Sequence, residues 1–370
     1  MKLTGLIAKP DGSILRGQIA FADRITGFDS TADSGDDYIL PGLVDLQVNG
    51  SHGIDVMNAS ADALATLSHH LAREGTTAWM PTAVTAPIEK IAQVHESIAS
   101  AFENSRRDDS SGAATILGMH LEGPFISPLR LGAHPALNLD PRGEAFEQVL
   151  AMRALRLITL APELVGALDA IRRLTARNVV VSIGHTNATL DEAHAGIDAG
   201  ARMFTHLFNA MRPLNHRDPG VIACALAPSA AIAAIIPDAV HVHPAILRLV
   251  FDARGRGGMI VVTDKVALAG TTGSEKIVGR SRASIRDGAA RLDDGTLAGS
   301  IISMLDGVRI MVEKADVSVG HVAMMAATNP ARLIGANDRG IVQVGARADL
   351  ILLNRALELK SVFIAGREIS

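Results

Sequence analysis

Five polar residues follow apolar, strand-like segments of the chain, and their types suit metal-assisted hydrolysis. They are Glu122, His185, His206, His241 and Asp264, separated by 63, 21, 35 and 23 residues. One carboxylate and two imidazoles make a site for Zn²⁺ or a similar divalent ion with a position left open for water. Such an ion lowers the pKa of a bound water to about 7. A further carboxylate could then move a proton, and a further imidazole could polarise a carbonyl group.

The segments that carry these residues alternate with longer Ala- and Leu-rich stretches of helical period from Leu43 onward. The predicted strands include Ala114–Met119, Val179–Ile183, Ala231–Ile236 and Met259–Thr263. Strands that alternate with helices are typical of βα units around a parallel sheet. Three of the four separations match one βα unit each, and the separation of 63 residues matches two. In a parallel barrel the carboxyl ends of the strands open on one face, so the five residues could meet there.

One βα unit can be predicted in detail. Val179–Ile183 is a strand, and Thr189 with Glu192 has the spacing of a capping box at a helix start. Gly200 is expected to end this helix. Residues 201–205 then begin the next strand, which leads into His206.

The two ends of the chain have a different pattern from the middle. Short strand-like pieces are separated by turn residues before residue 42 and again after residue 335. We predict that residues 1–41 and 336–370 pair in one small sheet domain, and that residues 42–335 form the barrel.

Composition narrows the classes of protein to which the chain could belong. Of its 370 residues 48% are hydrophobic, 20% are charged and only 3% are aromatic, which excludes a disordered protein. The single cysteine, Cys224, excludes a disulfide framework and fits a reducing compartment. A net charge of -4 gives no general attraction to nucleic acid or to anionic lipid. No signal peptide is predicted, and prolines interrupt the longest uncharged stretch, residues 219–237. We therefore expect a cytoplasmic protein that binds neither nucleic acid nor membranes.

Around these residues the sequence resembles the N-acetylglucosamine-6-phosphate deacetylase family of the amidohydrolase superfamily. The matching motifs occur in the family's order and span nearly the whole chain. They are PGLVDLQVNG at 41–50, HLEGPF at 120–125, GAHP at 132–135, GHT at 184–186, THLFNAM at 205–211, RDPG at 217–220, VTD at 262–264, LAGS at 297–300 and TNPA at 328–331.

The resemblance implies an α/β fold, a TIM-type (β/α) barrel with a small β-sandwich built from both chain ends. It implies hydrolysis of the acetamide of N-acetyl-D-glucosamine 6-phosphate to D-glucosamine 6-phosphate and acetate. By matched position, Glu122, His185 and His206 would hold one divalent metal, Asp264 would be the catalytic acid and base, and His241 would contact the substrate and its carbonyl. The other implied substrate-binding residues are Ala133, His134, Asn209, Ala210, Arg217, Leu297, Ala298 and Gly299. Members of the family are commonly homodimers, and some site groups could come from the partner chain.

Two departures from related proteins shape the prediction. Many members of the superfamily begin the barrel with His-x-His and bridge two metals with a modified lysine. Here Gln47 and Asn49 stand at the equivalent place, and no lysine occurs between Lys90 and Lys265. We therefore predict a single metal on Glu122, although Asp264 could share a second ion. Gln47 and Asn49 are either site-lining residues or satisfied amides at a strand end.

Lys265 directly follows the predicted catalytic aspartate, where the family usually has a small residue. A lysine facing the site would lower the pKa of Asp264 and weaken it as a base. Successive strand residues point to opposite faces, so we expect Lys265 to point away from Asp264. Ala239 is a further departure, since the family usually has Asp-Gly before the substrate histidine.

The sequence is also compatible with other functions. The same barrel could deacetylate a related N-acetylated amino sugar or hydrolyse a cyclic amide, and a non-catalytic barrel could serve as an interaction module. Zinc is the first choice of metal, and iron, cobalt and manganese also accept nitrogen and oxygen ligands.

Overall fold

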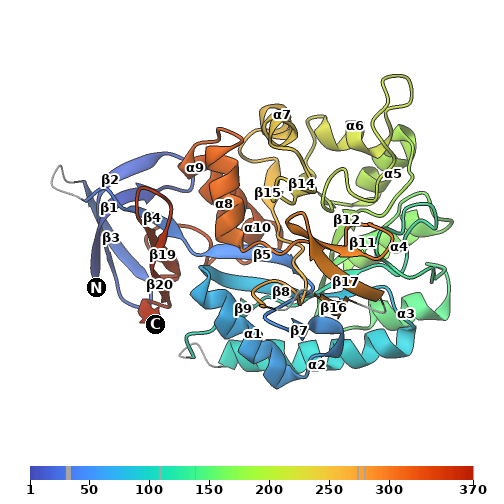
Figure 1. Cartoon of the computed structure of the whole chain (residues 1–370), viewed down its shortest axis with the longest axis horizontal. Coiled ribbons are helices and arrows are strands. Elements are labelled where there is room, and N and C mark those ends of the chain that lie inside the picture. The colour runs from blue at the N-terminus through green and yellow to red at the C-terminus, as the bar shows by residue number, and fades with distance from the viewer. Residues whose placement is uncertain (31–34, 108–110, 138, 273–274, 279–280, 370) are drawn as a thin grey trace.

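The molecule is a nearly closed barrel of eight parallel strands beside a separate sheet made from the two chain ends (Figure 1). The computed structural model describes residues 1–30, 35–107, 111–137, 139–272, 275–278 and 281–369. The predicted α/β barrel with a terminal sheet is confirmed. The barrel strands run in the order β15-β14-β13-β12-β11-β10-β8-β5. Their bounds are β5 Leu43–Val48, β8 Thr76–Val84, β10 Met119–Glu122, β11 Leu155–Leu160, β12 Val180–Ile183, β13 Met203–Phe204, β14 Ile232–Ile235 and β15 Met259–Val261.

Hydrogen bonds at the carboxyl ends of the first and last strands, β5 and β15, bring the two edges of the barrel together. The backbone N–H of Asp264 donates to Gln47 O at 2.9 Å, and that of Asn49 donates to Lys265 O at 2.8 Å. Apolar residues from six different barrel strands pack on one another and fill the interior. They include Val44, Met80, Leu157, Met203, Ala234 and Ile260.

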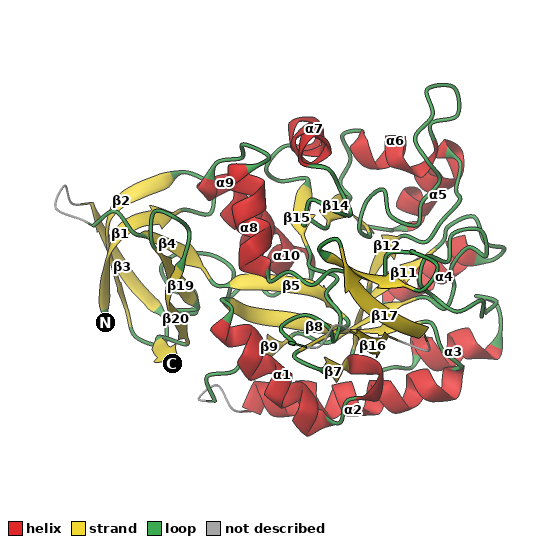
Figure 2. Ribbon diagram, viewed as in Figure 1, coloured by secondary structure: helices red, strands yellow, loops and turns green. Residues whose placement is uncertain are grey.

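Helices surround the barrel (Figure 2). Their apolar residues face the strands and are buried against them. Most of their buried residues belong to one large cluster of aliphatic side chains. The helices are α1 Ala61–Arg73, α2 Ile88–Arg107, α3 Glu144–Leu150, α4 Ala167–Ala176, α5 Leu190–Ala199, α6 Gly220–Leu226, α7 Pro244–Arg254, α8 Met304–Glu313, α9 Val319–Ala323 and α10 Asn329–Leu333, with a 3-10 turn at Val56–Asn58 (η1) and a π-helical turn at Met324–Thr328 (η2).

The terminal sheet has seven strands in the order β21-β20-β19-β4-β1-β2-β3, and both chain ends lie in it (Figure 1). Its strands are β1 Lys2–Ala8, β2 Ile14–Phe21, β3 Ile25–Ser30, β4 Tyr38–Pro41, β19 Leu350–Leu353, β20 Leu359–Ile364 and β21 Arg367–Ile369. The two ends of the chain meet where β4 pairs antiparallel with β19, with Pro41 opposite Leu350. The domain boundaries at residues 41 and 336 stay a prediction.

The βα unit predicted in detail is confirmed, whereas one predicted strand is broken. Helix α5 begins after Thr189, whose side chain forms a capping box with Glu192, and it ends at Gly200. The run Ala114–Met119 is not one strand, because Gly118 takes φ +125° and separates β9 (Thr115–Ile116) from β10. Among the described strands β9 pairs with β8 alone, and β10 continues the barrel.

Two small sheets complete the described structure. Strands β16 (Glu275–Val278), β17 (Ser281–Arg286) and β18 (Ala289–Leu292) form an antiparallel sheet, and β6 (Gly50–Ser51) pairs with β7 (Ile54–Asp55). Residues at the end of β18 and in the loop after it line the cavity at the barrel mouth. None of the helices in the described ranges is long and apolar enough to cross a membrane.

Candidate active site

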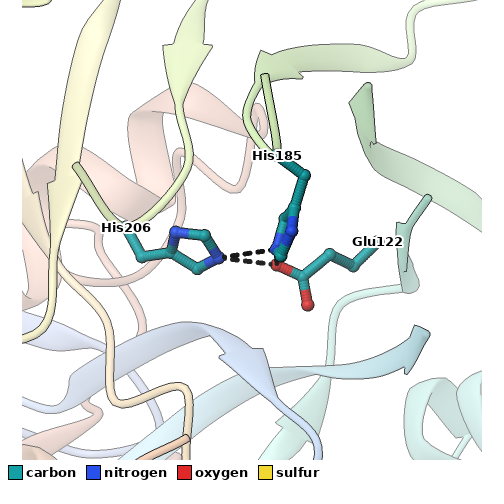
Figure 3. A group of neighbouring side chains, drawn as sticks. All are labelled: Glu122, His185 and His206. Atoms are coloured by element: carbon teal, nitrogen blue, oxygen red, sulfur yellow. Dashed lines mark hydrogen bonds and ion pairs between the residues drawn. The ribbon is translucent and has the colours of Figure 1, made fainter. Parts of the chain in front are cut away.

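Three side chains converge at the carboxyl ends of the barrel strands (Figure 3). Glu122 is the last residue of β10, His185 lies two residues after β12, and His206 lies two residues after β13. All three are buried, and one ligand atom of each lies within 4.8 Å of the others. The strand-end positions that the sequence predicted therefore do bring these residues together.

The geometry of this cluster fits a divalent cation. His206 Nε2 lies 2.9 Å and His185 Nε2 lies 3.3 Å from Glu122 Oε1, while the two Nε2 atoms are 3.2 Å apart. Two imidazole nitrogens at this separation cannot both offer lone pairs to each other, but both can bind one ion. His185 Nδ1 lies 3.0 Å from the carbonyl oxygen of Arg130. A proton on Nδ1 would be donated to that oxygen, which leaves the Nε2 lone pair directed at the cluster.

The pKa shifts of His185 and Glu122 favour the deprotonated forms that metal ligands need. Burial, followed by the nearby His134, lowers the pKa of His185 to about 4. Although burial acts to raise the pKa of Glu122, hydrogen bonds with His134, His185 and His206 hold it well below its ordinary value. A neutral imidazole and an ionised carboxylate are the forms that bind a cation. His206 differs, because although burial acts to lower its pKa, its hydrogen bond with Glu122 raises that pKa above the ordinary value.

Three residues of the site adopt backbone conformations that side chains rarely take. His185 has φ +48°, His206 has φ +26° and Asp264 has φ +51°. Such left-handed residues cost about 1–3 kcal/mol each and cluster at functional sites. Their coincidence at three separate strand ends indicates that the surrounding structure holds these side chains in place for a function.

Asp264 lies beside the cluster, where two amides fix one of its oxygens. The side-chain amide of Gln47 donates to Asp264 Oδ1 at 3.0 Å and to Glu122 Oε1 at 2.9 Å. The side-chain amide of Asn49 donates to Asp264 Oδ1 at 2.7 Å. Burial, and next the charge of Glu122, raise the pKa of Asp264 to about 6. A carboxyl group with such a pKa can accept and return a proton near neutral pH.

Two polar atoms at this edge of the site have no hydrogen-bond partner among the described residues. They are Gln47 Oε1 and Asn49 Oδ1, and both are buried. Buried polar groups are normally paired, so these two acceptors indicate that a bound group completes the site. Both amides contact Asp264, and Asn49 also lines the cavity, while a role of either residue in the reaction stays a prediction.

His241 reaches the same region on the loop after β14. Its Nδ1 lies 2.6 Å from Asp238 Oδ2, and the backbone N–H of His241 donates to Asp238 Oδ1 at 2.7 Å. Burial acts to raise the pKa of Asp238, but its hydrogen bonds with His241 lower it below the ordinary value. Asp238 therefore holds the imidazole in one orientation, with Nε2 available to the cavity.

A cavity of about 1020 Å³ opens over these residues at the barrel mouth. It is lined by Glu122, His185, His206, His241, Asp264 and Asn49, and by most of the other predicted substrate-binding residues, which are Ala133, His134, Asn209, Ala210, Leu297, Ala298 and Gly299. Gly299 has φ +90°, and a side chain there would lie 2.5 Å from the carbonyl oxygen of Asp264. Glycine is therefore required at this point of the wall.

Arg217 is the one predicted substrate-binding residue that the chain does not bring into its own cavity. Its side chain is exposed on the loop before α6, and only its backbone N–H has a described hydrogen bond, to Asn215 at 2.9 Å. The neighbouring Asp218 pairs with Arg212 instead. A role for Arg217 in phosphate binding stays a prediction.

The sequence matches the amidohydrolase family over residues 38–369, which is nearly the whole chain and contains every residue of the site. The chain belongs to the amidohydrolase family. It is 37% identical over 333 residues to an N-acetylglucosamine-6-phosphate deacetylase of Bacillus subtilis, covering 88% of this chain and 82% of that protein. It is 35% identical over 333 residues to an N-acetylgalactosamine-6-phosphate deacetylase of Escherichia coli O157:H7, covering 89% and 87%.

The fold of this amidohydrolase is similar to that of a solved deacetylase structure. An N-acetyl-D-glucosamine-6-phosphate deacetylase of Mycobacterium smegmatis, a D267A mutant in complex with N-acetyl-D-glucosamine-6-phosphate, superposes with a TM-score of 0.91. The two sequences are 32% identical, and the match covers 100% of this chain and 98% of that chain. The predicted family resemblance is confirmed.

Sequence reasoning missed several residues of this amidohydrolase site. Lys90 and Arg291 bring positive charge to the cavity wall, Thr85 lies 2.8 Å from His134 Nδ1, and Asp238 orients His241. Two of these residues had a local signal, since Asp238 stands three positions before His241 and Thr85 directly follows strand β8. Lys90, in the first turn of α2, and Arg291, in β18, reach the cavity only through the tertiary fold.

Lys265 points away from the cavity of this amidohydrolase, as expected. Its ammonium lies 2.5 Å from Glu74 Oε2 and its side chain is 2% exposed. It is absent from the cavity lining among the described residues, whereas Asp264 and Val266 on either side of it are present.

Proposed function

We propose that this amidohydrolase removes the acetyl group from an N-acetylated amino sugar 6-phosphate, with N-acetyl-D-glucosamine 6-phosphate as first substrate. The single observation that carries the proposal is the buried Glu122, His185 and His206 cluster with Asp264 beside it at the barrel mouth. A cavity of about 1020 Å³ has ample room for a sugar phosphate. The products would be D-glucosamine 6-phosphate and acetate.

The residues present fit one divalent metal, which Glu122, His185 and His206 would hold. Zinc is our first choice, with iron, cobalt or manganese as alternatives, because all accept this donor set. Such an ion would activate a water molecule and polarise the acetyl carbonyl. Side chains of the protein would carry out the proton transfers and hold the substrate.

Asp264 would take a proton from the attacking water and return it to the departing amine. Its Oδ1 is held by the amides of Gln47 and Asn49, and its other oxygen has no described partner, so it can face the reacting atoms. His241, oriented by Asp238, would hold the carbonyl oxygen or a neighbouring substrate atom through Nε2. His134, whose Nε2 lies 3.6 Å from Glu122 Oε2, would border the sugar.

The phosphate end of the substrate would meet the cations at the rim. Lys90 and Arg291 line the cavity, and the Nε of Arg291 is buried with no hydrogen-bond partner among described residues. Arg217 lies outside the cavity of its own chain, so we propose that a homodimer delivers it to the partner's site. Mixing two inactive variants tests this idea, since a heterodimer of Arg217→Ala and Asp264→Asn chains would regain one complete site. Absence of recovered activity in the mixture would place Arg217 outside the partner's site.

The C4 epimer is a second candidate substrate, because the N-acetylgalactosamine-6-phosphate relative is nearly as similar to this chain as the N-acetylglucosamine-6-phosphate relative. Acetate release from both 6-phosphates and from unphosphorylated N-acetylglucosamine would rank the substrates by kcat/KM. Metal content is measured on the same sample, and Asp264→Asn serves as the inactive control. A metal-loaded protein that releases acetate from neither 6-phosphate would contradict the proposal. We also propose a cytoplasmic location, which the single, buried Cys224 supports.

A further inference from the structure

A second cavity, of about 460 Å³, lies at the other end of the barrel. On the barrel side it is walled by the last turns of α2, by β9 and by the start of β11. The turn between β2 and β3 and the segment before β19 close it from the terminal sheet. It shares no lining residue with the active-site cavity. Its volume lies within the range of small-molecule sites, roughly 300–1,000 Å³.

The lining of this cavity is strongly basic for a protein whose net charge is -4. Five arginines face it against two aspartates, Asp23 and Asp338. The arginines are Arg24, Arg106, Arg156, Arg339 and Arg347.

Two of these arginines are held by carboxylates. Arg347 is 6% exposed, and its Nε donates to Asp349 Oδ1 at 2.8 Å. Arg339 donates from Nε to Asp338 Oδ1 at 3.1 Å, but its Nη1 is buried without a hydrogen-bond partner among described residues. A buried guanidinium nitrogen without an acceptor costs free energy, so an anion or another acceptor bound in the cavity would stabilise Arg339 Nη1.

The other three arginines have no carboxylate partner in the described part of the chain. Arg106 and Arg156 both lie over the ring of Phe102, each with its guanidinium carbon 5.5 Å from the ring centre. Arg156 also donates to the carbonyl oxygens of Arg153 and Leu155.

Arg24 donates from Nη1 to Gly345 O at 2.8 Å. These contacts position three guanidinium groups of Arg24, Arg106 and Arg156 without neutralising their charge. Like charges gathered in one cavity repel, and a bound dianion would relieve that repulsion.

We propose that this cavity is a second binding site, for a small phosphate monoester. A phosphate group offers three terminal oxygens and about two negative charges, which suit several planar guanidinium forks at once. A single carboxylate would leave most of the positive charge uncompensated. Because the lining joins the barrel to the terminal sheet, the bound ester bridges the two and stabilises their junction.

Calorimetric titration of the intact, metal-loaded protein with inorganic phosphate and with glycerol 3-phosphate tests the proposal, with chloride at matched ionic strength as reference. We expect Arg156→Gln to weaken binding of both probes at this site at least ten-fold. Arg172→Gln, which removes the same charge from an exposed position on α4, is the matched control and should leave binding unchanged. Deacetylation by the Arg156→Gln protein should persist, which separates this proposal from the proposed function.

Arg24→Gln provides an independent variant, because Arg24 is exposed and its loss cannot collapse the core. It too should weaken binding of both probes. Wild-type affinity in both variants would overturn the proposal, as would failure of glycerol 3-phosphate to bind. An unchanged affinity combined with dissociation of an oligomer in Arg24→Gln would also overturn it, in favour of a protein contact.

Discussion

The buried ion pair between Lys265 and Glu74 allows a stability prediction with a magnitude. The ammonium lies 2.5 Å from the carboxylate, the Lys265 side chain is 2% exposed and that of Glu74 is 24% exposed. Glu74→Gln would leave a buried cation without its counter-charge. Removing one partner of a buried pair costs about 3–5 kcal/mol, and the partial exposure of Glu74 favours the lower end. With about 2.1 cal/mol/K per residue of unfolding entropy over 370 residues, about 3 kcal/mol lowers Tm by about 4 °C.

Scanning calorimetry of three variants separates the unpaired charge from lost packing. The double variant Glu74→Gln/Lys265→Met removes both charges at similar volume, so we expect it to regain most of the lost stability. Glu313→Gln changes an exposed carboxylate at the end of α8 and should move Tm by less than about 1 °C. The reasoning is refuted if the single and double variants lose the same stability, because the cost would then come from volume rather than charge.

The remaining predictions concern the proton carrier, a buried acid and the phosphate end. Asp264→Asn should keep metal content and Tm, since the Asn oxygen can still accept from both amides. Its kcat should fall by about 10²–10⁴, because an amide cannot carry the proton, and near-normal turnover would remove Asp264 from the mechanism. Burial raises the pKa of Asp45 to about 6, despite hydrogen bonds from Thr263 and Gln47 that lower it. Its folded pKa lies above its unfolded value near 3.8, so its ionisation destabilises the fold as pH rises from about 4 to about 6, by up to about 3 kcal/mol. The stability of Asp45→Asn relative to the parent, measured by urea unfolding of both proteins after chelation, should therefore increase over that window, and a flat difference would contradict the shift. Arg291→Gln should raise KM for the 6-phosphate several-fold and leave KM for N-acetylglucosamine unchanged; an equal effect on both would indicate a structural role.

The sequence predicted those features of the site that follow from local position. Glu122, His185 and His206 converge because each lies at, or two residues after, the carboxyl end of a parallel strand, and these strand ends share one face of a barrel. The capping box at Thr189 is equally local, and the structure confirms it. Lys265 could be oriented from strand alternation alone.

Features that depend on loop paths could not be predicted in this way. Arg291 reaches the mouth only because β18 folds back over the barrel, which no spacing reveals. Gly118 breaks a continuous apolar run through its backbone angle, although the run itself has the pattern of one strand. Arg217 belongs to a matched motif, yet its loop extends into solvent in the single chain.

The pairing of β4 with β19 has a consequence for how the protein is made. Pro41 and Leu350 are opposite each other in one sheet, but about 310 residues of synthesis separate them. At about 5–20 residues per second, the edge of β4 is exposed on the ribosome for about 15–60 s before its partner exists. During this time β4 exposes Ile39 and Leu40, which are both fully buried in the folded protein. Chaperone dependence during translation should therefore concentrate on the first forty residues, long before the barrel that they support is complete.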